Sequence, residues 1–269
     1  GTLGIFPRPE PGPPRLKQVL TTPRLAALVV LLAVVFSWPV VQSAGRDLDY
    51  GANVSRFLSR FWPPDFSILP QIFPSLVETL QMAVLATVAS TLIGIPLAIA
   101  ASKTIVPRPL VGATRLGLSL IRAIPGLIWA LIAVAILGAN TLAGVIALVI
   151  YSLGYLGKFF SDAFESADPA MSKALRATGA GRLQAFQYGI WPQARPLVWS
   201  HALWMLEYNI RSATIIGYVG AGGIGAWLYT YQEFYQWDKF AAVLACILTA
   251  VILLDLAGSR LRSALAPES

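Results

Sequence analysis

The sequence has 269 residues, of which 56% are hydrophobic and only 12% are charged. Soluble domains carry about 25% charged residues, so this composition excludes an ordinary soluble protein and indicates an integral membrane protein. The formal net charge is +7, but the basic residues lie in short loops between apolar runs, which is typical of membrane proteins and argues against nucleic-acid binding.

The first part of the chain predicts a cytoplasmic tail, a transmembrane helix and an interfacial segment. Residues 1–23 are rich in proline and lack an apolar face, so we expect a flexible tail. Residues 24–44 hold the first apolar run, which we interpret as a membrane span. Residues 45–75 mix charged and aromatic side chains, as segments at the outer surface of a membrane do.

Residues 76–260 predict a transmembrane domain. Since a helical span takes about 20 apolar residues, the whole chain has room for roughly six spans. Lys and Arg gather in loops on one side, so the positive-inside rule places both termini, including the tail at 261–269, in the cytoplasm. The fold class we expect is all-α, with six transmembrane helices. The apolar runs after the first one lie at about 76–101, 117–138, 141–164, 197–219 and 239–258.

A polar segment separates the fourth and fifth predicted spans. Asp168 and Pro169 are suited to begin a helix, strong helix formers follow as far as Ala177, and Gly179 predicts its end. We therefore expect a short helix in water within about 168–182. The alternative is an ordinary amphipathic helix at the lipid headgroups.

This segment resembles the signature of permease subunits of bacterial binding-protein-dependent ABC importers. That signature is a Glu-Ala-Ala triplet, a glycine four residues after the second alanine, and a proline thirteen residues after the glycine. Lysine here replaces the glutamate and leucine the second alanine. The resemblance implies a type I importer fold in which the short helix couples to a separate ATPase subunit. The residues that it implies for coupling are Lys173, Ala174, Leu175, Arg176, Gly179, Arg182 and Pro192.

Further segments narrow the resemblance to phosphonate-type permeases, which serve phosphonates, phosphite and related oxyanions. From it we expect import by alternating access, an external phosphonate-binding protein, and a second permease copy, identical or similar. The same architecture with methionine or another amino acid as cargo stays open, and an intramembrane enzyme is a remote alternative. The segments lie at 78–83, 122–130, 175–180, 209–214 and 219–225.

Charged side chains inside the predicted spans are candidates for contact with cargo, because an unpaired charge at mid-span costs at least about 2.5 kcal/mol. Arg122 presents a planar donor fork that suits an oxyanion, although it can also extend to the cytoplasmic surface. Glu207 and Arg211 stand four residues apart on one helix face, where they can pair and serve packing alone. The other candidates for a substrate path are Trp129, Tyr155, Asn209 and Ser212.

Proline and glycine mark candidate hinges. Pro125 removes a backbone donor within the third predicted span. The glycine-rich stretch after the fifth span resembles a dinucleotide-binding loop only superficially, because no βαβ unit surrounds it. We interpret it as a bend at the external end of that span and as part of a gate. Its candidate residues are Gly220, Gly222, Gly223 and Gly225.

The sequence contains no Gly-x-x-x-x-Gly-Lys-Ser/Thr loop for nucleotide phosphates. We therefore expect a non-catalytic translocation subunit, with ATP and magnesium bound by the partner ATPase. Cys246 and His201 are the single cysteine and histidine, which argues against a disulfide framework and against a metal site.

Overall fold

A computed structural model describes residues 16–42 and 49–265. The contacts divide the chain into two units; the first ends at Ser55 and the second begins at Arg56. The first unit contains α1 (Leu16–Gln42), whose side chains from 25 to 40 are exposed wherever they are described. An apolar helix that buries no face within its own unit needs lipid or another chain around it.

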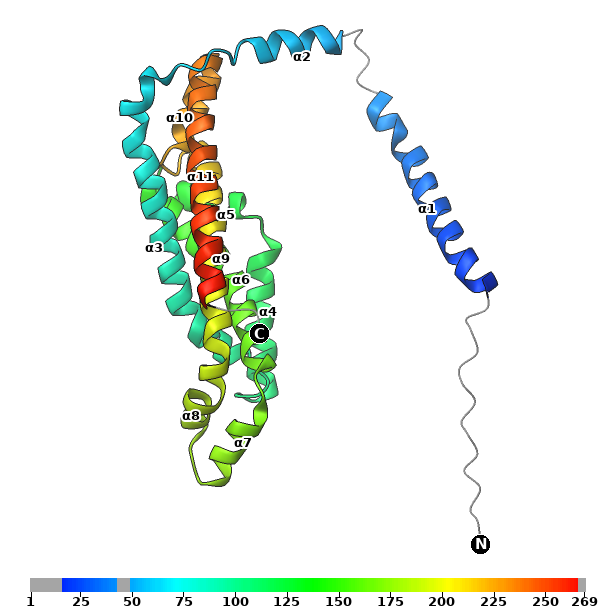
Figure 1. The fold of residues 1–269 in the computed structure, drawn as a ribbon, viewed down its shortest axis with the longest axis vertical. Helices are drawn as coiled ribbons and strands as arrows, with labels where there is room; N and C mark the ends of the chain where they lie inside the picture. Colours follow the sequence, from blue (N-terminus) through cyan, green and yellow to red (C-terminus); the bar gives the residue numbers. More distant parts are fainter. Residues whose placement is uncertain (1–15, 43–48, 266–269) are drawn as a thin grey trace. The chain divides into compact units, whose positions relative to one another are not determined.

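The second unit is a helical bundle (Figure 1). Its long helices α3, α6 and α9 lie against one another, and α11 packs mainly against α9. Helices α7 and α8 stand at one end, and α10 stands toward the other. The elements from α2, which crosses the boundary between the units, are α2 (Tyr50–Ser59), η1 (Phe66–Ile68), α3 (Leu69–Ala101), α4 (Arg108–Ala123), α5 (Gly126–Leu137), α6 (Thr141–Ser166), α7 (Pro169–Ala177), α8 (Arg182–Ala185), the π-helix η2 (Phe186–Ile190), α9 (Trp191–Tyr218), α10 (Gly225–Glu233) and α11 (Trp237–Leu265).

Helices long and apolar enough to cross a membrane number three among the described residues, or four if one bent pair counts as a single span. They are Phe66–Ala101, Thr141–Ser166 and Trp237–Arg260, with α4 and α5 as the bent pair. The prediction of six spans is therefore not confirmed as a count. The apolar stretch of α1 is shorter, and α9 has polar and charged side chains among its apolar ones.

The third predicted span, about 117–138, is not one continuous helix but parts of two helices, α4 and α5. The chain is helical already from Arg108, and α4 and α5 meet at an angle of 86°. Ile124 and Pro125 have extended backbones, with ψ of 123° and 144°. Proline disfavours a helical conformation in the residue before it and donates no hydrogen bond, so the helix breaks here.

The centre of the bundle is a polar contact between three long helices. Asn209 of α9 is fully buried. Its Nδ2 donates to Thr87 Oγ1 of α3 at 2.9 Å, and its Oδ1 accepts from Ser152 Oγ of α6 at 3.0 Å. Because a buried amide without partners is unfavourable in an apolar interior, these bonds specify how α3, α6 and α9 are aligned.

Candidate functional site

The short helix α7 is built by local sequence signals. Asp168 Oδ1 accepts a hydrogen bond from Ala170 N at 2.9 Å, and Pro169 is the first helical residue. After the helix, Gly179 has a φ of 91°, which is strained for any residue with a Cβ atom. The predicted helix start at Asp168 and Pro169 and the predicted break at Gly179 are confirmed.

Helix α7 packs closely against η2 where Ser172 faces Gly189. A Cβ atom on Gly189 would lie 2.9 Å from both Cα and N of Ser172. Gln193, in the first turn of α9, accepts a hydrogen bond from Asp168 N at 3.0 Å and donates to Gly189 O at 2.7 Å. Helix α7 is thus fastened to the start of α9, next to Pro192.

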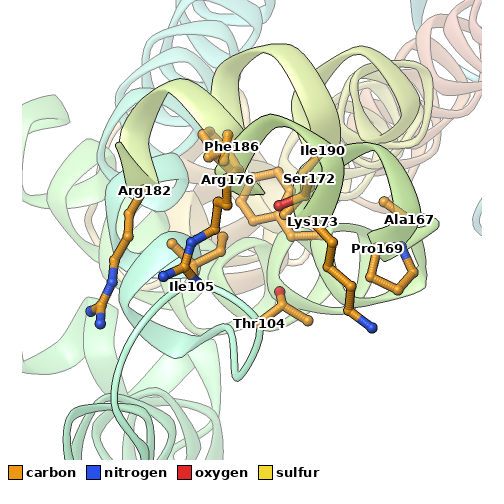
Figure 2. A pocket seen from close by; sticks show the side chains of 12 residues that line it. Thr104, Ile105, Ala167, Pro169, Ser172, Lys173, Arg176, Arg182, Phe186 and Ile190 are labelled. Carbon is orange, nitrogen blue, oxygen red and sulfur yellow. The ribbon is translucent and has the colours of Figure 1, made fainter. Parts of the chain in front are cut away.

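A pocket of about 220 Å³ opens beside α7 (Figure 2). Phe164, Phe186 and Ile190 contribute apolar side chains to it, and the loop with Thr104 lies opposite α7. Three basic side chains stand at the pocket, namely Lys173, Arg176 and Arg182. Those of Lys173 and Arg182 extend away from it, while that of Arg176 extends toward Ile105.

The charge of this surface is not neutralised within the described part of the chain. Lys173, Arg176 and Arg182 are exposed, and none of their three side chains forms a hydrogen bond or ion pair with another described residue. Between Asp168 and Glu207 the sequence contains no carboxylate at all. We call Lys173, Arg176 and Arg182 the basic surface; of the other residues expected to couple, Ala174 and Leu175 lie on α7 as well.

Arg122, in the last turn of α4, retains an unused donor. Its Nη2 donates to Ser119 Oγ at 3.3 Å, and its Cζ lies 5.9 Å from the centre of the Tyr155 ring. Its Nε is buried and has no hydrogen-bond partner in the described structure. A buried guanidinium N–H without a partner is suited to receive an anion.

Aromatic side chains continue from Tyr155 toward α9. The rings of Tyr151 and Tyr155 are 4.9 Å apart, and the Tyr151 and Tyr208 hydroxyls are 2.7 Å apart. Tyr151, Tyr208 and Ser212 line a further pocket of about 170 Å³ between α5, α6 and α9. The structure thus connects Arg122 to Ser212 through three tyrosines. Tyr208 was not predicted from the sequence, although its position four residues before Ser212 places both on one helix face and was the available signal.

The other predicted path residues lie apart from this series. Asn209 is occupied in the central contact described above, and Glu207 is buried in α9. Arg211 Nη1 pairs with Asp255 Oδ1 of α11 at 3.1 Å, a partner that the sequence did not single out. Trp129 Nε1 donates to Ile121 O at 3.2 Å across the bend between α4 and α5.

The glycine-rich stretch forms a tight loop between α9 and α10. Gly220, Gly222 and Gly223 have φ values of 92°, 79° and 73°, which glycine adopts without strain. The loop is fastened by Glu78 of α3, which accepts hydrogen bonds from Gly223 N at 3.3 Å and from the Thr141 hydroxyl of α6. From the sequence alone, Glu78 is expected to be an ordinary residue at the edge of a span, because its partners are distant in sequence. Gly225 begins α10.

Residues 90–267 match a protein family described as binding-protein-dependent transport system inner membrane component. The chain belongs to this family. The matched region of this inner membrane component includes α7, the basic surface, Arg122 and the glycine loop. Among the described residues, no group of three or more His, Cys, Asp and Glu side chains is placed to hold a metal ion.

Relatives of this inner membrane component include phosphorus oxyanion permeases. Phosphite transport system permease protein PtxC of Stutzerimonas stutzeri is 38% identical over 204 residues, which cover 76% of this chain and 74% of PtxC. Phosphate-import permease protein PhnE of Mycolicibacterium smegmatis is 32% identical over 237 residues, or 88% of this chain and 44% of PhnE. The resemblance to importer permeases is confirmed.

A solved structure of the MetNI methionine ABC transporter, in an inward-facing conformation, shares the fold. Its TM-score is 0.67 at 22% sequence identity, over 75% of this chain and 99% of that chain. The importer permease fold is thus confirmed over three-quarters of the chain, while identity this low bears on the fold alone.

Proposed function

We propose that this chain is the translocation subunit of an ATP-driven importer for phosphite, phosphonate or a related phosphorus oxyanion. The observation that carries the proposal is the 38% identity to a phosphite permease over 204 residues. Two features of the structure support it: a helix that projects from one end of the bundle, and a buried arginine donor without a partner.

The first feature supplies the coupling step. Helix α7 is a rigid element fastened to α9, so a force applied to it moves the bundle. No carboxylate lies between Lys173 and Arg182 in the sequence, which suits a separate ATPase subunit whose docking cleft is acidic. Closure of two ATPase subunits on ATP then displaces α7, and its release after hydrolysis allows α7 to return.

The second feature supplies contact with the cargo. The Nε of Arg122 is a buried donor, and a hydrogen bond from a buried N–H to an oxyanion is stronger than the same bond in water. The Tyr151, Tyr155, Tyr208 and Ser212 side chains offer rings and hydroxyls along the same series. We infer that an oxyanion passes along this series when an external binding protein delivers it.

The proposed function also implies an orientation of the subunit in the membrane and a set of partners. Both termini lie in the cytoplasm of a bacterial cell, α7 faces the cytoplasm, and a second permease copy completes the path. ATP and magnesium bind to the ATPase and not to this chain.

Transport by the complete importer in proteoliposomes tests the proposal. With its ATPase and binding protein present, we expect ATP-dependent uptake of phosphite, methylphosphonate or phosphate, and no uptake of methionine. ATP-dependent uptake of methionine in place of these anions would contradict the proposed cargo. Uptake without the ATPase would contradict the proposed division of labour.

A further inference from the structure

An ion pair at the α7 end of the bundle joins four segments of the chain. Glu165 Oε1, in α6, accepts hydrogen bonds from Arg115 Nη2 of α4 and from Lys103 N of the α3–α4 loop, both at 2.6 Å. Arg115 Nε also donates to Ala101 O, in the last turn of α3, at 2.8 Å. Both charged side chains are about three-quarters buried, with 25% and 24% of their surface exposed, so water weakens this pair less than it weakens a surface pair.

The pair lies next to the element that we assign to coupling. Helix α6 ends at Ser166 and α7 begins at Pro169. Only Ala167 and Asp168 separate the two helices, so a displacement of α7 acts almost directly on Glu165.

The other member of the pair lies on the helix that carries Arg122. Leu118 and Arg122 follow Arg115 on the face of α4 that packs against α6. A Cβ atom on Gly157 would lie 2.8 Å from Leu118 Cδ2, and one on Gly154 would lie 2.8 Å from Arg122 Cγ. Helices that pack this closely shift together and do not slide freely.

We propose that the Arg115–Glu165 pair passes the movement of α7 to α4, and through α4 to Arg122 and the bend at Pro125. This inference rests on the proposed function. Arg115 and Glu165 are positioning residues, since neither contacts cargo or nucleotide. When the pair is broken, the ATPase still docks on α7 and hydrolyses ATP, but α4 follows α7 incompletely and less cargo is delivered per ATP.

The test measures cargo delivered per ATP hydrolysed by the complete importer in proteoliposomes. Equimolar phosphite, methylphosphonate and phosphate are supplied outside, and the phosphorus that enters is measured beside ATP hydrolysis. Glu165→Gln keeps the size of the side chain and removes its charge. We expect the ratio to fall about fivefold, as weakening of a charge-assisted hydrogen bond predicts, while the ATPase still copurifies.

A second variant and a matched control accompany it. Arg115→Lys keeps the charge but cannot bond Glu165 and Ala101 O together, and it should lower the ratio even if Glu165→Gln fails to insert. Asp162→Asn breaks the ion pair of Lys158 with Asp162, whose two members both lie on α6 and which therefore does not join α6 to α4. The control should leave the ratio unchanged.

The double variant completes the design. If Arg115 and Glu165 act through their contact, the ratio in the double variant equals that of the lower single variant. Unchanged ratios in both single variants, additive losses in the double variant, or an equal loss in Asp162→Asn would overturn the inference. Failure of the unmodified importer to deliver any phosphorus would instead contradict the proposed function.

Discussion

Arg122 has a closely packed side chain and a hydrogen-bond donor, Nε, without a partner in the described structure. It is therefore the residue at which the proposed contact with cargo is tested most directly. Its side chain packs against Gly154 and Tyr155, while its Nε has no partner in the described structure. Arg122→Ala should lower oxyanion uptake by at least about tenfold, the effect of losing one hydrogen bond to a charged group. Uptake and ATPase copurification, measured side by side, check this.

Two variants show whether the guanidinium itself matters. Arg122→Lys keeps the charge but loses the donor fork, so uptake should recover only in part. Arg108→Ala removes an exposed arginine from the first turn of the same helix and should leave uptake unchanged. An equal loss of uptake and of ATPase copurification in Arg122→Ala would make the residue structural.

Asn209 is expected to stabilise the helical bundle through its two buried hydrogen bonds. Asn209→Ala would leave Thr87 and Ser152 with lost partners in a buried site. The free energy of unfolding should fall by about 1 to 3 kcal/mol, which thermal unfolding of the detergent-solubilised protein would detect. Ser212→Ala, three residues further along α9, is the control, and a similar loss of stability there would show that the central contact has no special weight.

Among the elements, α7 and its turn are the ones that sequence reasoning anticipated best. Asp168, Pro169 and Gly179 act through local backbone chemistry, so their roles are readable without a structure. The bend between α4 and α5 was readable only in part: Pro125 marked a hinge, but the helical start at Arg108 lies in a polar stretch that hydropathy does not detect. The Arg115–Glu165 and Glu78–Gly223 contacts join distant parts of the chain, and a single sequence carries no signal for them.

The turn after α7 gives a prediction at this scale. Gly179 has a positive φ, and a Cβ atom added to it would meet nothing within 4 Å, so a substitution acts through the backbone and through added charge, not through a clash. Gly179→Asp should abolish uptake while the protein remains inserted in the membrane, because the turn is strained and the carboxylate disturbs docking. Uptake and membrane content are measured in parallel.

Gly181 offers a matched control two residues away. Its φ of −67° suits any residue, so Gly181→Ala should leave uptake near the unmodified value. Normal uptake in Gly179→Asp would count against the coupling role of this turn.

At the scale of the whole molecule, the basic surface predicts the chemistry of a partner. Reversal of two charges, in Lys173→Glu with Arg176→Glu, should abolish copurification of the ATPase, because an acidic docking cleft repels the changed surface. The control is Arg56→Glu with Arg60→Glu, which changes the net charge by the same amount at two exposed residues that precede α3. Unaffected copurification in the first variant would exclude an electrostatic role for the basic surface.

The contacts of Glu78 also have a consequence for the insertion of α3 into the membrane during synthesis. Its partners Thr141 and Gly223 follow it by 63 and 145 residues, so the ribosome produces both well after Glu78 itself. Until they arrive, the carboxylate must stay hydrated, since an unpaired charge in hydrocarbon is unfavourable. Newly synthesised α3 is therefore expected to settle at its final depth late, once translation has supplied the loop that follows α9.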